Sequence, residues 1–224
     1  MSSVLNLEKF QQLYTYTFPN EVLNQLQYKI YQTNEYILKT GDKIDGLYFL
    51  IEGKYYVSSL EITGKELLLR YSNKPAILGD IEILEQCPIQ SNCIAVENCE
   101  FIYVPLMIYH SYLKNDAEFT QLLLKELAYK LKTCTISSRV NALSPVSVRL
   151  AAYYCTIAST KVNSEYINSN KLDEVASLIG TTKRHVNRIL KRWNEEGTIY
   201  RDGDYIQILN WEKIKFYSND VRFE

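Results

Sequence analysis

The chain has 224 residues, of which 25 are Lys or Arg and 26 are Asp or Glu, so its formal net charge is −1. This length is enough for one large core or two modest ones, and the near-neutral charge excludes a protein that is cationic over its whole surface. Any contact with nucleic acid must therefore come from a local basic patch, and no apolar run is long enough to span a membrane.

The first part of the chain is predicted to be helical and then rich in β-structure. Residues 5–26 are expected to be mostly helical, with a break at Pro19. From residue 28 to residue 104, short apolar runs alternate with turn residues such as Gly41 and Gly46. Several short strands at this spacing indicate a β-sandwich or barrel.

A short helix from Pro105 to Leu113 is expected to lead into a long helix from about Asp116 to Val140. At about 1.5 Å per residue, the long helix spans roughly 35 Å. Its apolar stripe consists of Phe119, Leu123, Leu124, Leu127, Ala128, Leu131 and Cys134. The spacing alone favours packing within one domain, because the stripe runs for fewer than four clean heptads, but a seam with a second copy is also compatible with it.

The last part of the chain begins with a new helix at Ser144-Pro145, because Ser is a good N-cap and Pro suits the first helical position. This helix is expected to end near Thr160, and residues 141–144 are the expected hinge before it. Residues 171–197 then predict two short helices joined by a tight turn at Gly180. After them, Asp202-Gly203 between apolar runs predicts a β-hairpin, which completes a winged helix-turn-helix.

The two helices around Gly180 are both amphipathic, and the second is strongly basic. The apolar face of the first consists of Leu172, Val175, Ala176, Leu178 and Ile179. The inward residues of the second are Val186, Ile189, Leu190 and Trp193. Its outer face carries Lys183, Arg184, His185, Asn187, Arg188, Lys191 and Arg192, with no acidic residue among them.

This outer face has two interpretations. It could be an ordinary solvated surface. Alternatively it reads DNA, which requires a helix that fits the major groove, roughly 12 Å wide, and presents hydrogen-bond donors near its N-terminus. The layout favours the second interpretation, because Thr181 and Thr182 also precede the helix where phosphate oxygens could approach. Double-stranded DNA is therefore the expected partner.

Catalytic and metal-binding patterns are not found in the sequence. Its two histidines, His110 and His185, lie in different parts of the chain, and there is no GxSxG, HExxH or P-loop motif. Cys87, Cys93 and Cys99 are spaced by six, whereas structural metal sites usually contain pairs spaced by about two to four. We therefore expect no enzyme, no metal and no cofactor, and we interpret the cysteines as small core residues.

The N-terminus lacks the charged and apolar regions of a signal peptide, so we expect a cytoplasmic protein. In that compartment the five cysteines are expected to be thiols rather than disulfides. Redox sensing by Cys87, Cys93 and Cys99 remains an alternative.

The order of these parts resembles the Crp/Fnr family of bacterial transcription regulators. The resemblance runs from about residue 28 to residue 211 and is carried by EYILKTGDKIDGLYFLIEGKYYV (35–57), GDIEIL (79–84) and LIGTTKRHVNRILKRWNEEGTI (178–199). GDIEIL followed by VPLMIYH and LKND is also similar to the YeiL-type branch of the family. The resemblance implies an α+β fold with three parts: a sensor β-roll (jelly roll) like a cyclic-nucleotide-binding domain, with N-terminal helices, over 1–114; a dimerisation helix and hinge over 115–143; and a winged helix-turn-helix domain over 144–224.

The resemblance further implies a homodimer whose long helices pair along their length. It also implies RNA polymerase as a partner. The two reading helices would enter successive major grooves, roughly 34 Å apart, on an inverted-repeat operator. Lys183, Arg184 and Arg188 align with the base-reading triplet of the family, whose middle member is commonly Glu. Arg184 can only donate, so the preferred half-site is expected to differ from the best-known one. The expected phosphate contacts are Thr181, Thr182, His185, Asn187, Lys191 and Arg192.

The sensor half departs from the family pattern. Members that bind cyclic nucleotides have Gly-Glu and, about ten residues later, Arg-Ser, whereas this chain has Gly79-Asp80 and Gln90-Ser91. A neutral amide cannot pair bidentately with a phosphate, so we expect an unidentified small-molecule effector rather than cyclic AMP. The expected effector pocket comprises Gly79, Asp80, Gln90, Ser91, Cys134 and Thr135. The N-terminal cysteine cluster of the iron–sulfur members has no counterpart before Cys87.

The sequence thus predicts a dimeric, sequence-specific DNA-binding regulator that senses a signal through its β-roll. Two alternatives come from other classes: a ligand-binding β-roll whose C-terminal part contacts only protein, and an enzyme built on a jelly roll.

Overall fold

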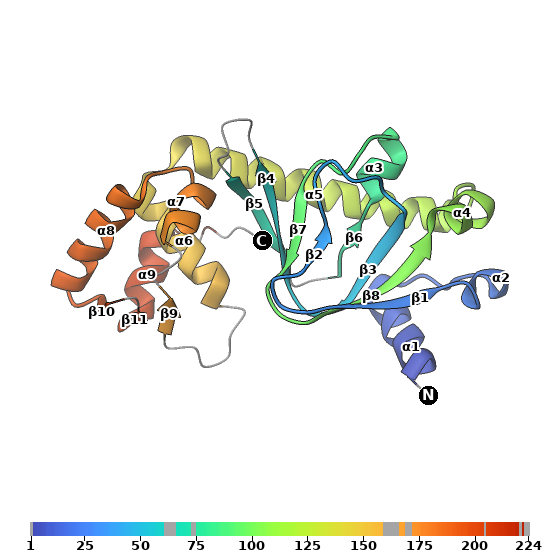
Figure 1. Cartoon of the computed structure of the whole chain (residues 1–224), viewed down its shortest axis with the longest axis horizontal. Coiled ribbons are helices and arrows are strands. Elements are labelled where there is room, and N and C mark those ends of the chain that lie inside the picture. Colours follow the sequence, from blue (N-terminus) through green and yellow to red (C-terminus); the bar gives the residue numbers. More distant parts are fainter. Residues whose placement is uncertain are drawn as a thin grey trace. The chain divides into compact units, whose positions relative to one another are not determined.

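The computed structural model describes residues 2–60, 66–72, 75–158, 166–168, 172–203, 205–219 and 221. They form two compact units (Figure 1). The first unit comprises Met1–Val57 and Ser72–Lys132, and the second comprises Ser58–Tyr71 and Thr133–Glu224. The elements confirm the predicted α+β class: an N-terminal antiparallel β-domain, a long helix and a C-terminal helix-turn-helix domain. None of the described helices combines the length and the apolar character needed to cross a membrane.

Two helices open the first unit, α1 (Ser2–Tyr14) and α2 (Asn20–Leu23). Pro19, the N-cap residue of α2, separates them as predicted. The described part of the chain then forms two four-stranded sheets, with strand orders β1-β8-β3-β6 and β2-β7-β4-β5. The strands are β1 (Gln27–Tyr31), β2 (Tyr36–Leu38), β3 (Gly46–Glu52), β4 (Tyr55–Leu60), β5 (Glu66–Ser72), β6 (Ile77–Leu78), β7 (Asn92–Ala95) and β8 (Cys99–Pro105).

Between β6 and β7 lies α3 (Asp80–Glu85), a short helix that the sequence analysis did not predict. It starts directly after Gly79, whose φ of +87° lies in the left-handed region that favours glycine. A Cβ atom at Gly79 would lie 2.6 Å from the carbonyl oxygen of Gly46, so the backbone after β6 closely approaches the start of β3 here. After β8, α4 (Leu106–Ile108) and the π-helical turn η1 (Tyr109–Leu113) occupy the position of the short predicted helix.

The core of the first unit is aromatic. The rings of Phe10, Phe18, Phe49 and Phe119 are fully or almost fully buried and contact one another with centroid distances between 4.7 and 6.4 Å. Beside them, the Tyr14 hydroxyl donates to the carbonyl oxygen of Leu50 at 2.8 Å and accepts from the Ala76 N–H at 2.9 Å. These contacts attach α1 and the start of the long helix to β3.

The long helix α5 (Ala117–Leu143) begins where the sequence predicts. Its start is fixed by Asp116, whose carboxylate accepts from the Phe119 N–H at 2.9 Å and from the Tyr16 hydroxyl at 2.8 Å. The backbone hydrogen bond from Phe119 is the main reason why the pKa of Asp116 is lowered. Its end corrects the predicted hinge: residues 141–143 are helical, because the Ser144 N–H still donates to Val140 O. The interruption is limited to Ser144 and Pro145, which has no N–H to continue the ladder.

The apolar stripe predicted on α5 divides into two faces. Phe119 and Leu123 are buried in the core of the first unit. Leu124 and Leu131 are 59% and 70% exposed, and Ala128 between them is also exposed. The predicted stripe is therefore partly a core face and partly an uncovered apolar face.

The described part of the second unit contains α6 (Val146–Ala158), β9 (Tyr166–Asn168), α7 (Leu172–Leu178), α8 (Lys183–Glu195), β10 (Ile199–Asp202), β11 (Tyr205–Ile208) and α9 (Trp211–Ser218). The strands form a three-stranded antiparallel sheet in the order β10-β11-β9. The predicted helix-turn-helix and hairpin are confirmed, whereas β9 and α9 were not predicted. The predicted end of α6 near Thr160 lies outside the described residues.

Candidate nucleic-acid interface

The basic helix α8 lies at an edge of the second unit, between α7 and β10 in the chain (Figure 1). Its four predicted inward residues are all buried, and Trp193 is fully buried and stacked on Tyr217 with 5.5 Å between ring centroids. The N-terminus of α8 is capped by Thr182, whose side chain accepts from the His185 N–H at 3.3 Å. The opposite face of the helix is therefore fixed toward solvent.

Arg149 on α6 stabilises the turn that precedes α8 through a hydrogen bond. Its Nη1 donates to the carbonyl oxygen of Ile179 at 2.7 Å, where α7 has ended. The following residue, Gly180, has a φ of +65°, as the predicted tight turn requires. Burial lowers the pKa of Arg149. Arg149 was not among the predicted site residues, although a lone Arg within the apolar run of α6 is a signal that the sequence offers.

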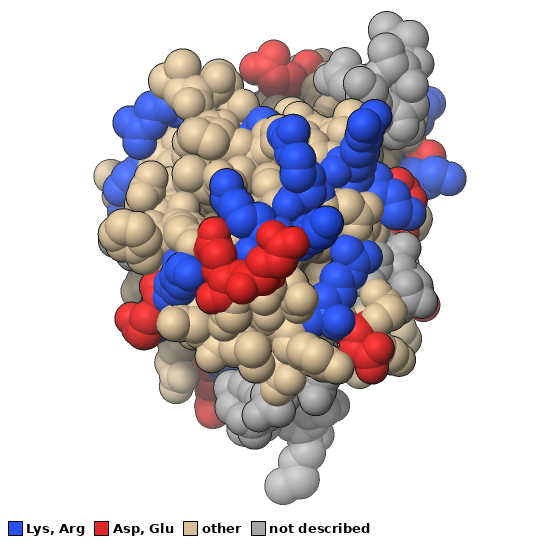
Figure 2. All heavy atoms as spheres, turned by 90° about the vertical axis from the view of Figure 1, so that its left-hand side faces the viewer, with Lys and Arg blue, Asp and Glu red and all other residues tan. Residues whose placement is uncertain are grey.

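The charges on α8 are less uniform than the sequence suggests. Carboxylates from outside the outer face reach three of its cations: Lys183 pairs with Asp173 of α7 at 2.6 Å, Lys191 with Glu195 at 3.9 Å and Arg192 with Glu196 at 3.7 Å. Figure 2, which views the side where α8 lies, shows Lys and Arg side chains gathered near the centre with Asp and Glu among them. Within the part of the chain that the structure describes, Arg184 and Arg188 have no ion-pair partner.

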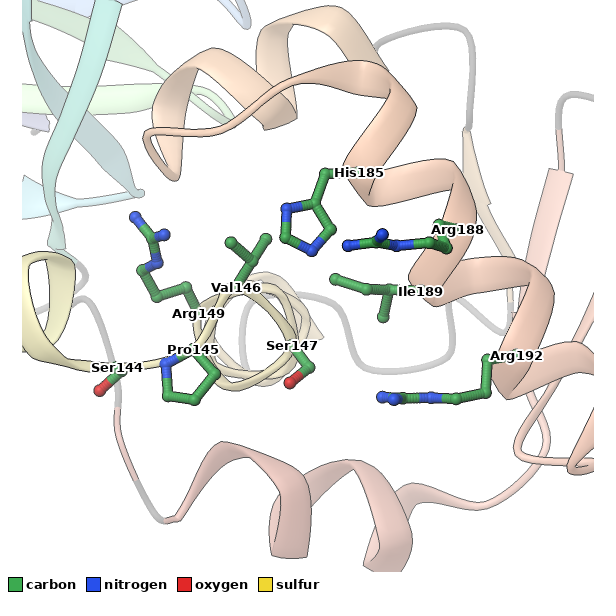
Figure 3. A pocket seen from close by; sticks show the side chains of 9 residues that line it. All are labelled: Ser144, Pro145, Val146, Ser147, Arg149, His185, Arg188, Ile189 and Arg192. Carbon is green, nitrogen blue, oxygen red and sulfur yellow. The ribbon is translucent and has the colours of Figure 1, made fainter.

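A surface hollow of about 570 Å³ separates α8 from the start of α6 (Figure 3). It is lined by Ser144, Pro145, Val146, Ser147, Arg149, His185, Arg188, Ile189 and Arg192. His185, Arg188 and Arg192 extend from α8 toward the start of α6, whereas the guanidinium of Arg149 points away toward the turn (Figure 3). The N-terminus of α6 adds the positive end of its helix dipole to these cations. The hollow is thus suited to a phosphate group.

A second hollow follows the outer face of α8 and is lined by Thr182, Arg184, His185, Asn187, Arg188 and Lys191. Asn187 is not isolated there, because its Oδ1 accepts from Nη1 of Arg201 at 2.7 Å. Arg201 belongs to β10, and its backbone N–H donates to Oδ1 of Asn194 at 3.0 Å. Arg201 was not predicted as a site residue, because its partner lies 14 residues earlier and leaves no local signal in the sequence.

His185 is the histidine of this face. Its pKa is lowered, first by burial and then by the positive charges of Arg188 and Arg149. The imidazole is therefore neutral in the free protein at neutral pH. Its Nδ1 lies 3.4 Å from Oγ1 of Thr181.

We expect the affinity for duplex DNA to rise as the pH falls from about 8 to about 5.5, because a phosphate beside His185 would raise its pKa above that in the free protein, and binding would then take up a proton. Titration of a fluorescent duplex with the protein at a series of pH values between about 5.5 and 8 measures this effect. His185→Asn should flatten the pH profile, and His110→Asn, in the first unit, is the matched control that should keep it. An unchanged profile in His185→Asn would exclude this role.

Two of the predicted effector residues, Asp80 and Gln90, are bonded to other groups of the chain. The Asp80 carboxylate is buried and bonded to the ammonium group of Lys130, which also donates to the carbonyl oxygen of Ile77 at 2.6 Å. Gln90 is exposed, and its amide donates to the carbonyl oxygen of Pro88 at 2.7 Å.

Gly79, Asp80, Gln90 and Ser91 belong to the first unit. Cys134 and Thr135 occupy exposed positions of α5 in the second unit.

All five cysteines carry thiols rather than disulfides. Cys93 and Cys99 are buried, and Cys87 is half-buried. The Cys99 thiol donates to the carbonyl oxygen of Lys54 at 3.0 Å, and burial raises its pKa to about 12, so it is not a reactive thiolate. The described residues contain no cluster of three or more His, Cys, Asp and Glu side chains that could hold a metal ion.

Two family profiles match the chain. The family described as the cyclic nucleotide-binding domain matches residues 28–116, and the Crp-like helix-turn-helix domain matches residues 148–217. The first range covers almost all of β1 to β8, and the second covers almost all of the segment from α6 to α9.

Curated relatives agree with these profiles. The regulatory protein YeiL of Escherichia coli O157:H7 is 23% identical over 167 residues, which cover 75% of this chain and 74% of the relative. The cAMP-activated global transcriptional regulator CRP of Haemophilus influenzae is 21% identical over 183 residues, covering 80% of this chain and 82% of the relative.

Solved structures share the fold. A CRP-family regulator from Thermus thermophilus aligns with a TM-score of 0.71 at 19% identity, over 88% of this chain and 98% of that one. A second CRP/FNR-family regulator from the same organism aligns with a TM-score of 0.71 at 20% identity, over 86% of this chain and 98% of that one.

Proposed function

Because this chain is a member of the Crp/Fnr family of transcription regulators, we propose that it is a homodimer that binds an inverted-repeat operator through α8. The observation that carries this proposal is a pair of guanidinium groups on the outer face of α8, Arg184 and Arg188, which have no ion-pair partner among the described residues. The family consists of DNA-binding regulators, so an enzymatic role is not proposed. The proposed site of action is the cytoplasm, where the DNA is.

We assign base reading to Arg184 and Arg188, which suit the acceptor atoms N7 and O6 of guanine. Lys183 completes the predicted triplet, and its exposed pair with Asp173 can be exchanged for a DNA contact at little cost. The proposed phosphate contacts are Thr181, Thr182, His185, Asn187, Lys191 and Arg192. The hollow between α6 and α8 supports them, since its cations and helix N-terminus would face the backbone of the duplex.

The test of DNA binding uses the full chain and a library of random-sequence duplexes. Selection should enrich an inverted repeat, and the affinity for the selected duplex should fall steeply with salt, because cations that contact phosphates release counterions. A C-terminal part that contacts only protein would enrich no sequence at any salt concentration. That result would exclude DNA reading and favour the protein-contact alternative.

The proposed dimer seam is the uncovered apolar face of α5, which contains Leu124, Ala128 and Leu131. These residues are spaced by four and three, the spacing at which paired helices contact each other. A second copy of the chain would cover them with the same residues, since a two-fold interface is self-complementary.

We expect Leu131→Glu to convert the dimer to a monomer, because each copy would bring a carboxylate into an apolar seam where the other copy brings the same charge. Sedimentation velocity at micromolar protein concentration measures the change. Leu84→Glu, at an exposed leucine of α3, is the matched control and should remain dimeric. A dimeric Leu131→Glu variant would locate the seam elsewhere.

The signal is proposed to be a small molecule other than cyclic AMP. Gly79-Asp80 and Gln90-Ser91 do not fit a cyclic phosphate: the Gln90 amide is neutral, and the Asp80 carboxylate is already bonded to Lys130. Thiol sensing is the second candidate, but the raised pKa of Cys99 counts against it. The triple variant Cys87→Ser, Cys93→Ser and Cys99→Ser separates the two candidates. Unchanged regulation of DNA affinity in this variant would exclude thiol sensing.

We propose that residues 1–114 sense the signal, residues 115–143 form the dimer and residues 144–224 bind DNA. A signal would shift the population of poses of the two reading helices, with Ser144-Pro145 as the joint. RNA polymerase is the proposed partner in transcription.

A further inference from the structure

We propose that Arg201 in the β10–β11 hairpin (the wing) fixes the side-chain amide of Asn187 with its oxygen toward the wing, so that Asn187 offers its NH₂ donors to the operator. This inference rests on the proposed binding of DNA through α8. It adds a positioning residue and restricts what the reading face can recognise.

The chemistry of the contact sets the orientation of the amide. A guanidinium group has five N–H donors and no acceptor, so the atom of Asn187 that faces Nη1 of Arg201 must be the carbonyl oxygen. The NH₂ group of Asn187 therefore points away from Arg201. Because the donor is charged, this hydrogen bond is stronger than one between neutral groups.

Arg201 is itself held in place by the wing and by α8. In the β10–β11 hairpin it is paired with Ile206, which is fully buried. Its backbone N–H donates to Asn194, and its side chain donates to Asn187. The two Asn residues are seven positions apart and therefore lie on the same side of α8, two turns from each other. The wing is thus bonded to α8 at both points.

No carboxylate among the described residues neutralises the charge of Arg201. Among the residues that the structure describes, its side chain is bonded to Asn187 and no carboxylate lies within 4.0 Å of it. Arg201 is half-buried, so its side chain is more restricted than the exposed lysines of α8. Among the described residues, no ion pair therefore competes with Asn187 for the Arg201 guanidinium.

The consequence concerns which bases the face can read. An Asn reads adenine bidentately, accepting from N6 with Oδ1 and donating to N7 with Nδ2. With Oδ1 turned toward Arg201, Asn187 is not free to adopt this bidentate orientation and offers its NH₂ donors instead. The hollow on α8 that contains Asn187 also contains the donors Arg184, Arg188 and Lys191. The four side chains together suit acceptor atoms: guanine O6 and N7, or phosphate oxygens.

The test is a double-mutant cycle with the full-length dimer. The random-sequence duplex library first gives the operator that the wild-type protein selects, and affinities for that operator are then measured for Asn187→Ala, Arg201→Ala and the double variant. Each single variant should bind about 3- to 10-fold more weakly, the effect of one hydrogen bond. The double variant should bind no more weakly than the weaker single variant, because Arg201 acts through Asn187.

Two further measurements identify the acceptor. If it is a base, selection with Arg201→Ala should admit adenine at one position of each half-site, because the released amide can turn. If it is a phosphate, base preference should stay the same, and a neutral methylphosphonate at the contacted position should remove the effect of both single variants. Lys215→Ala, which removes a positive charge from α9, is the control and should leave the affinity unchanged.

Losses that add in the double variant would overturn this inference, since Arg201 would then contact DNA independently. A wild-type chain that enriches no duplex would overturn the proposed function together with the inference. The two failures are therefore distinguishable.

Discussion

Replacing Lys130 by methionine is expected to lower the free energy of unfolding by about 3–5 kcal/mol, the usual cost of removing one partner of a buried ion pair. The side chains of Lys130 and Asp80 are only 9% and 1% exposed. Without the ammonium group, the Asp80 carboxylate stays buried without a counter-charge, and the Ile77 carbonyl loses its donor. Urea denaturation at a fixed protein concentration measures the change, because the stability of a dimer depends on concentration.

Two controls separate the buried charge from the loss of a long side chain. The double variant Asp80→Leu with Lys130→Met should be more stable than Lys130→Met alone, since no charge then remains buried. Lys183→Met breaks the exposed pair with Asp173 and should change stability by no more than about 1 kcal/mol. If Lys130→Met is no more destabilising than Lys183→Met, the pair does not contribute as described.

Arg188→Ala is expected to weaken operator binding by about 1–3 kcal/mol, which corresponds to roughly 5- to 150-fold. Arg188 is exposed and has no ion-pair partner among the described residues, so its full charge and its planar donor fork are available to DNA. Fluorescence anisotropy with the selected operator measures the loss.

Arg188→Lys is the informative companion, because it keeps the charge and loses the bidentate geometry. If Arg188 reads guanine, Arg188→Lys should lose most of the specificity at one position while keeping nearly the wild-type salt dependence. A variant that keeps its base preference but shows a shallower salt dependence would make Arg188 a phosphate contact. Unchanged binding by a folded Arg188→Ala would remove the assignment altogether.

The helix-turn-helix could be predicted in detail because its signals are local. The apolar spacing of α8 identified all four buried residues, and Asp202-Gly203 located the hairpin between β10 and β11. The short elements α3, β9 and α9 were missed. Segments this short are stabilised by contacts with distant parts of the chain, as the fully buried Ile214 of α9 illustrates.

The sequence predicted only some of the buried residues of α5. The stripe read from the sequence combined residues of the core face, such as Phe119 and Leu123, with exposed residues such as Leu131. Lys130 lies seven residues after Leu123 and eleven after Phe119, so helical periodicity places it on the core face. That position was a usable signal for a buried lysine, but its partner Asp80 lies 50 residues away and could not be inferred.

The cations of the candidate site were predicted from the sequence, but the side chains that contact them were not. Sequence reasoning found the cations of α8 because they share one helix. It could not find that Asp173 neutralises Lys183 or that Arg201 holds Asn187, since both contacts join separate elements. Contacts between elements depend on how the elements pack, which local patterns do not contain.

Because Trp193 packs against Tyr217 within the second unit and the first unit has no tryptophan, the two units are optically distinguishable. Both tryptophans of the chain, Trp193 and Trp211, belong to the second unit. Intrinsic emission excited at the red edge of the absorption band therefore follows the loss of structure around α8 and α9 alone, while circular dichroism follows the whole chain. A mismatch between the two signals during denaturation would reveal a partly folded species in which one half of the protein has melted before the other.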